Sequence, residues 1–149
     1  MRVLKFSLMI QIKSFFRTIK YKALVLGWAV DFLGSLFLAT VSGVIAAIAL
    51  SIRHGGKMDM DEWHSWMRSD RVLIVTLLVG LLFTFLGGAV AARQAKAAEY
   101  RHALMVCLLS MACGHALGSH DVPAWFLWTG IVSSIPVSLA GAYLVKRSN

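Results

Sequence analysis

One acidic side chain, Asp31, interrupts an apolar run from Ala23 to Leu50 that carries no other charge. An apolar run of this length spans a bilayer when it forms a helix. Ionisable residues inside such spans are costly to insert, and they mark ion pathways, proton relays or paired contacts between helices. Asp31 is therefore the first candidate for chemistry in this chain.

Three hydroxyl residues are predicted to lie at the same depth as Asp31. Asp31 is eight residues past Ala23, which is about 12 Å at 1.5 Å per residue. The predicted cytoplasmic ends of the later helices are Ala92, His102 and Lys146. Eight residues inward from each of them lies a residue with a hydroxyl group. The predicted polar layer consists of Asp31, Thr84, Ser110 and Ser138.

Two interpretations of this layer remain open. In the first, Asp31 is protonated, because burial in lipid disfavours a charged carboxyl, and it joins helices through hydrogen bonds of about 0.6 kcal/mol each. In the second, its proton is exchangeable and is coupled to a solute. Inserting an acid near a helix centre costs about 2.5 to 3.5 kcal/mol, which exceeds those hydrogen bonds and favours a function. Against this, no second acid and no basic relay partner occurs within any apolar run.

One face of the third apolar segment carries three soft ligands. Cys107, Met111 and His115 are spaced four residues apart, so a helix places them on the same side. Such ligands suit Cu(I), whereas a methionine in an apolar helix commonly serves packing. No C-x-x-C or H-E-x-x-H pattern accompanies them, so we predict no metal site and no cofactor.

The chain lacks the short motifs of soluble enzymes. It contains no G-x-S-x-G motif, no dinucleotide-binding glycine loop and no Walker loop, and its acids form no pair within an apolar run. We therefore predict that the protein is not an enzyme.

The candidate residues require a membrane bundle to position them. Hydrophobic side chains make up 58% of the chain and the mean hydropathy is +0.72, well above the values of soluble domains. Segments of membrane-spanning length predict an all-α integral membrane fold, in which residues 23–149 form four antiparallel transmembrane helices. The predicted spans are about 23–50, 72–92, 102–118 and 123–145, and the third is the shortest.

Residues 1–22 are predicted to form an amphipathic helix that lies on the membrane surface. Apolar side chains such as Leu4, Leu8 and Ile12 fall on one face of a helix, and basic side chains cluster on another. This pattern is typical of a helix that binds anionic lipids. The alternative is a disordered basic tail, because isolated helices are marginally stable.

The loop after the first predicted span is expected to contain a short helix. Its apolar residues Met60, Trp63 and Met67 recur at helical spacing, and Asp59 or Asp61 precedes them as a possible N-cap. Tryptophan prefers the headgroup level of a bilayer. We therefore predict a short helix resting on the outer membrane surface.

The distribution of charge predicts the orientation of the chain. The net charge is +8, and most basic residues lie before the first span, between the second and third spans, and at the C-terminus. Short loops rich in Lys and Arg stay in the cytoplasm, so both termini are predicted to be cytoplasmic. Anionic lipids of the inner leaflet account for this basic rim, and no nucleic-acid partner is predicted.

Small residues mark the faces on which membrane helices pack, because they let helix backbones approach closely. Each predicted span carries one such stripe. The predicted helix-packing residues are Gly27, Ser35, Gly80, Gly87, Gly88, Gly114, Ser134 and Gly141. These stripes favour a non-catalytic protein that packs as a homo-oligomer or within a larger membrane complex. The alternative is a small proton-coupled transporter that uses Asp31.

Two short motifs carry a resemblance to a known group of proteins. The second apolar segment ends in "GGAVAAR", from Gly87 to Arg93, and "RHALM" begins the third at Arg101. This region is similar to a loose group of small, mostly uncharacterised bacterial four-helix inner-membrane proteins. The resemblance implies a four-helix fold in a bacterial inner (cell) membrane, and it implies no activity.

Overall fold

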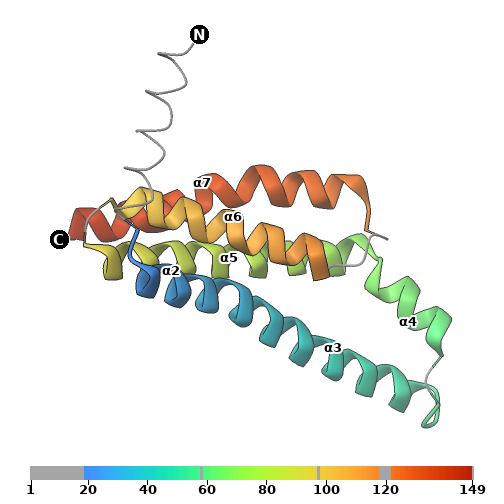
Figure 1. The fold of residues 1–149 in the computed structure, drawn as a ribbon. Coiled ribbons are helices and arrows are strands. Elements are labelled where there is room, and N and C mark those ends of the chain that lie inside the picture. Colours follow the sequence, from blue (N-terminus) through green and yellow to red (C-terminus); the bar gives the residue numbers. More distant parts are fainter. Residues whose placement is uncertain (1–18, 58, 97, 118–121, 149) are drawn as a thin grey trace.

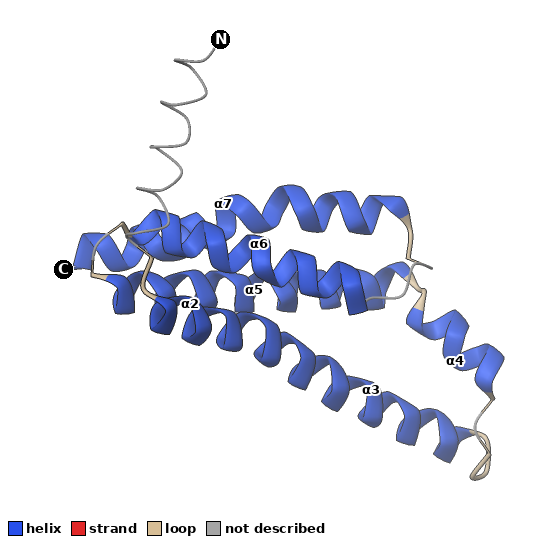
Figure 2. Ribbon diagram, in the orientation of Figure 1, coloured by secondary structure: helices blue, strands red, loops and turns tan. Residues whose placement is uncertain are grey.

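The computed structural model describes residues 19–57, 59–96, 98–117 and 122–148, and every regular element within these ranges is a helix (Figure 2). The predicted all-α class is confirmed for this part of the chain. In chain order the elements are α2 (Tyr21–Trp28), the π-helix η1 (Ala29–Leu33), α3 (Gly34–Arg53), α4 (Met60–Met67), α5 (Asp70–Ala95), α6 (Glu99–Leu117) and α7 (Ala124–Ser148).

Three of the described helical segments are long and apolar enough to cross a membrane. They are Tyr21–Arg53, Asp70–Ala95 and Ala124–Ser148. The remaining long helix, α6, has 19 residues and opens with Glu99 and a polar first turn. By length and composition, the three long apolar segments are compatible with a membrane protein.

The helices α5, α6 and α7 lie side by side, and the first helical segment joins them over one half of the molecule only (Figure 1). Figure 1 shows α5, α6 and α7 together, with α2 against them, while α3 diverges from the other helices toward α4. The starts of α2 and α6 and the ends of α5 and α7 meet at one end (Figure 1). We call this the basic end, after its residues Lys20, Lys22, Arg93, Lys96, Arg101, Lys146 and Arg147. The opposite end is called the α4 end.

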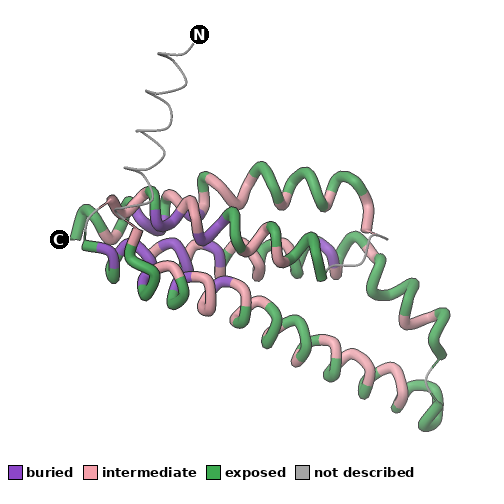
Figure 3. The backbone as a smooth tube through the Cα atoms, viewed as in Figure 1, coloured by how far each residue is buried: buried purple, intermediate pink, exposed green. Residues whose placement is uncertain are grey.

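The core lies in the half of the bundle near the basic end, as Figure 3 shows. It consists mainly of small residues, among them Ala91, Ala92, Ala103 and Ala142, which are fully buried. Among the described residues, α3 contains no buried residue. The chain therefore has one tightly packed half and one half in which α3 is largely exposed.

Glycines bring the helices of the packed half into backbone contact. A Cβ atom added to Gly27 would lie 2.7 Å from Ala91 Cβ and 2.8 Å from the carbonyl oxygen of Gly87. Gly88 and Gly141 make similar contacts between α5 and α7. These close approaches position the residues around Asp31, because small residues let membrane helices pack at short range.

Other predicted packing residues do not make such contacts. Cβ atoms added to Gly80 and Gly114 would meet no atom within 4 Å. Both lie toward the α4 end, where the helices are less closely packed. Ser35 is half-buried, and the Ser134 hydroxyl donates to the Gly130 carbonyl of its own helix at 2.6 Å.

The N-terminal boundary differs from the prediction. Residues 1–18 of the predicted surface helix lie outside the described residues. Ile19 and Lys20 are not helical, and Tyr21 already begins α2. The predicted division at residues 22 and 23 therefore falls inside a continuous helix.

The short helix predicted after Asp59 is confirmed as α4. The Asp59 carboxylate caps it by accepting hydrogen bonds from the backbone N–H groups of Asp61 at 2.9 Å and Glu62 at 3.3 Å. At the other end of the molecule, α5 ends with Lys96 in the left-handed region, with φ 55°. Ala98 has φ 53°, and the chain reverses there into α6.

Candidate functional site

Asp31 lies inside the bundle at the centre of η1. Its side chain is 3% exposed, and its carboxyl oxygen Oδ1 accepts a hydrogen bond of 3.0 Å from the hydroxyl of Thr84 on α5. Thr84 is buried as well. Two residues that are 53 positions apart in the chain thus form a buried polar contact between the first helical segment and α5.

The second oxygen of this carboxyl is unused. Ser110 of α6 lies beside Asp31, close enough for its hydroxyl to act on the carboxyl. The geometry nevertheless falls outside that of a hydrogen bond, and within the described residues Asp31 Oδ2 and Ser110 Oγ are both buried without a partner. The site therefore contains one carboxyl oxygen and one hydroxyl that lie next to each other and make no hydrogen bond.

A π-helical turn carries Asp31. The backbone of Ala29–Leu33 is wound more widely than the α-helices on either side, and such turns occur frequently at functional sites. The rings of Trp28 and Phe32 stack along this turn, with centroids 5.3 Å apart and an interplanar angle of 9°. The indole Nε1 of Trp28 is buried without a partner too.

Close packing bounds the site toward the basic end. A Cβ atom on Gly87 would lie 2.7 Å from Asp31 Cβ, so the backbone of α5 lies directly against the aspartate. One turn beyond the aspartate, toward the α4 end, the ring of Phe83 packs onto Gly34, where an added Cβ would meet it at 2.5 Å. On this second side, the contact at Gly34 is therefore with an aromatic side chain and not with backbone.

Ser138 does not join the predicted polar layer. Its hydroxyl donates to the carbonyl oxygen of Ala103 at 3.0 Å, and its backbone packs against Gly88. Gly88 follows Thr84 by one helical turn, so Ser138 lies about 6 Å nearer the basic end than the layer. Counting from the ends of helices does not detect such axial shifts between neighbours.

The helix face that carries Cys107, Met111 and His115 contains one pair of contacting sulfurs. The Cys107 thiol donates to Met111 Sδ at 3.7 Å, and Cys107 also lies within electrostatic range of Asp31. His115 is exposed. The described residues contain no group of three His, Cys, Asp or Glu side chains placed to hold a metal ion.

His102 has a role that the sequence did not suggest. It is fully buried, and its Nε2 accepts a 2.9 Å hydrogen bond from the backbone N–H of Lys20. Nδ1 therefore carries the proton of the neutral ring and donates to the Ala98 carbonyl at 3.0 Å. The histidine caps the start of α2 and ties it to the turn before α6. Its partners are backbone groups, which leave no signal in the sequence.

Comparison of the chain with protein-family models, with curated proteins and with solved structures finds no match. The resemblance to small four-helix bacterial membrane proteins stays a prediction. The function therefore has to be inferred from the site and its setting.

Proposed function

We propose that the chain is a non-catalytic protein of the bacterial inner membrane, which crosses the bilayer four times and assembles through α3 with a second copy of itself. The main observation behind this proposal is the exposure of α3. No residue of α3 is buried, although the helix belongs to one of the three segments long and apolar enough to cross a membrane.

The position of α6 supports a fourth membrane span. Its 19 residues extend about 28 Å at 1.5 Å per residue, close to the roughly 30 Å of a bilayer core. It packs against both α5 and α7, and Lys146 Nζ of α7 lies 5.0 Å from the ring centroid of Tyr100 in α6. A helix held at the level of two spanning neighbours crosses the bilayer with them.

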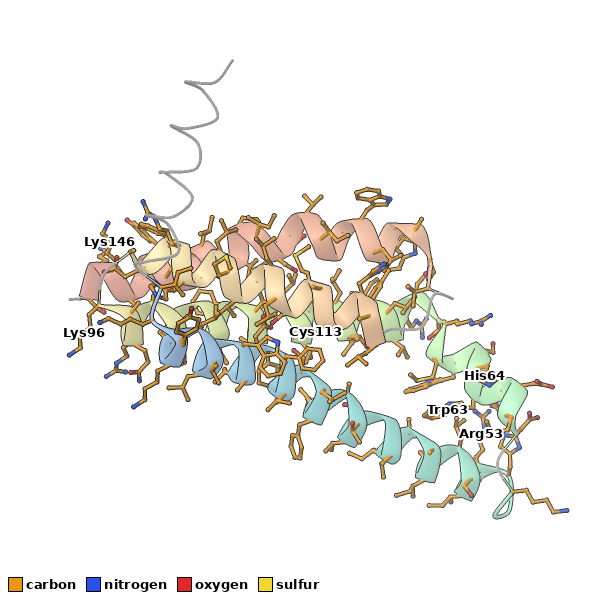
Figure 4. The ribbon with its side chains drawn as sticks, viewed as in Figure 1. Arg53, Trp63, His64, Lys96, Cys113 and Lys146 are labelled. Atoms are coloured by element: carbon orange, nitrogen blue, oxygen red, sulfur yellow. The ribbon has the colours of Figure 1, made fainter. Side chains whose placement is uncertain are left out.

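The charges support cytoplasmic termini. Figure 4 places Lys96 and Lys146 at one end of the bundle, and Arg53, Trp63 and His64 at the other. Basic residues collect at the first end, where anionic lipids of the inner leaflet would bind them. The α4 end carries acids beside its bases, such as Glu62, which pairs with His54.

The spacing of small residues on α3 supports self-association. We define the α3 small face as Ser35, Ala39, Ser42, Ala46 and Ala49. These residues recur at alternating steps of four and three, the spacing of helices that pack at small crossing angles. Three of them are exposed, and small residues are the typical contacts between membrane helices.

Energy transfer between donor- and acceptor-labelled copies in liposomes tests this assembly. The wild-type chain should show transfer that persists on dilution with lipid. Ser42→Leu, on the α3 small face, should weaken association at least tenfold, because a large side chain separates the helices. Val44→Leu, on the opposite side of α3, is the matched control and should leave association unchanged. Transfer no greater than that of randomly placed copies would remove self-assembly as the function.

A second candidate function is proton-coupled transport, with Asp31 as the proton carrier. The unpartnered oxygen of Asp31 favours it, because a carboxyl serving only as a strut between helices has no use for a free acceptor. Asp31 and Thr84 come from different elements, so a change at the carboxyl affects the contact between them.

Infrared spectroscopy of the chain in nanodiscs tests the second candidate. The carboxyl band of Asp31, obtained by subtracting the Asp31→Asn spectrum, should titrate between pH 4 and 9 if the proton is exchangeable. A carboxyl that remains protonated across this range would leave Asp31 as a hydrogen-bonding strut and would rule out proton coupling.

A further inference from the structure

Two neighbouring polar atoms in the bundle have no partner. Asp31 Oδ2 and Ser110 Oγ are both buried and unpartnered within the described residues, and they belong to side chains that lie side by side. Buried polar groups nearly always find a partner, and a lipid-surrounded bundle offers little water to supply one. A ligand that contacts both side chains would satisfy these two atoms.

Within the described residues, the groups that act on the Asp31 carboxyl include no cation. Each helix that supplies a residue to the site has its nearest cation about nine residues away, which is roughly 13 Å along the helix. The pairs are Lys22 and Asp31, Arg93 and Thr84, and Arg101 and Ser110. The titratable group that lies near the carboxyl is the Cys107 thiol of α6, which carries no positive charge. A cation bound from outside the chain is one way to balance an ionised Asp31.

The donor set of the site consists of oxygen atoms. Asp31 supplies two carboxyl oxygens, and Thr84 and Ser110 supply one hydroxyl oxygen each, from three different helices. Hard cations bind oxygen ligands of this kind.

We propose that Asp31, Thr84 and Ser110 bind one dehydrated monovalent metal cation of the size of Na⁺. The proposal rests on the membrane placement proposed above, and it shares Asp31 with the second candidate function. When the cation binds, Thr84 Oγ1 and Ser110 Oγ turn their lone pairs toward it, and Asp31 is ionised. The same carboxyl cannot hold a proton at the same time, so Na⁺ and H⁺ compete for the site.

The packing differs between the two sides of the site. Toward the basic end, the contacts of Gly27 and Gly87 bring backbone against backbone. Toward the α4 end, the Phe83 ring rests on Gly34, and a ring can rotate about its side-chain bonds.

Binding of radioactive ²²Na⁺ to the full chain in detergent, at constant ionic strength set with choline, tests the proposal. Wild-type protein should bind Na⁺ saturably. Ser110→Ala should weaken binding at least tenfold, and Asp31→Asn should abolish it. Ser134→Ala is the matched control, because the Ser134 hydroxyl already bonds to its own helix at Gly130, and it should bind as wild type does.

The outcomes separate this proposal from the proposed functions. If wild-type protein binds no Na⁺ while the infrared band of Asp31 titrates, the cation site is overturned and proton coupling stands. If Na⁺ binds with this pattern of variants but no solute moves with it in liposomes, the site stands and transport falls. If Asp31→Asn does not fold, thermal unfolding of wild-type protein and of Ser110→Ala replaces it. Na⁺ should raise the unfolding midpoint of wild-type protein, and it should raise the midpoint of Ser110→Ala by less. Equal midpoints with and without Na⁺ in wild type overturn the proposal.

Discussion

At the scale of single residues, the hydrogen bonds around Asp31 are unevenly distributed. One carboxyl oxygen accepts a hydrogen bond from Thr84, and the other lies beside Ser110 without a hydrogen-bond partner. The Thr84 bond is the contact that holds the carboxyl in a defined position. Removing this hydroxyl leaves a second buried oxygen of Asp31 without a partner.

Thr84→Val is expected to lower the free energy of unfolding by about 1 to 3 kcal/mol, the usual effect of leaving a buried polar group unsatisfied. Thr84→Ser keeps the hydroxyl and should retain most of this stability. Reversible unfolding in mixed micelles, followed by tryptophan fluorescence, measures both variants. Equal stability of the valine and serine variants would show that the hydrogen bond contributes nothing.

At the scale of helices, the glycines of α5 differ in what surrounds them. Gly87 lies where α5 touches the π-helical turn, whereas Gly80, two turns earlier, faces open space. The same chemical change at the two positions therefore has different consequences. This difference distinguishes a packing glycine from one that merely occurs in a helix.

Gly87→Ala is expected to destabilise the protein by about 1 to 3 kcal/mol, because the new methyl group overlaps Asp31 Cβ and the Gly27 carbonyl and forces the helices apart. Gly80→Ala should be neutral or stabilise by up to about 1 kcal/mol, since alanine favours the helix more than glycine does. Thermal unfolding of the two variants in nanodiscs provides the measurement. A stable Gly87→Ala protein would contradict the close contact between α2 and α5.

The elements were largely predictable from the sequence, and the details of the site were not. Hydrophobic run length and tryptophan spacing predicted α4 and the long apolar helices, and counting from helix ends brought Thr84 to the level of Asp31. The same counting misplaced Ser138, because axial shifts depend on which glycines touch. The π-helical turn has no sequence pattern, and the backbone partners of His102 cannot be recognised from residue types.

At the scale of the whole molecule, packing is asymmetric along the bundle axis. Apart from Leu73 at the start of α5, the buried residues lie in the half of the bundle near the basic end, and α3 leaves the bundle toward the α4 end (Figures 1 and 3). If the basic end is cytoplasmic, the packed half lies in the inner leaflet of the bilayer. The property to measure is therefore the orientation of the chain, that is, which side of the membrane each end of the bundle faces.

A membrane-impermeant maleimide applied to intact cells is expected to label Lys57→Cys and to leave Ser148→Cys unlabelled. Both positions are exposed and lie at opposite ends of the bundle. Wild-type protein, which has Cys107 and Cys113, gives the background. Labelling of Ser148→Cys in intact cells would reverse the proposed orientation.

The hydrogen bond between Asp31 and Thr84 also imposes an order in time on how the protein is made. Thr84 follows Asp31 by 53 residues, which a ribosome adds in roughly 3 to 11 s at 5 to 20 residues per second. During that interval the first helical segment enters the bilayer with an unpaired aspartate, at an insertion cost of about 2.5 to 3.5 kcal/mol. An 18-residue window within Tyr21–Arg53 has a mean hydropathy of 2.2, and its apolar side chains offset this cost until Thr84 is synthesised.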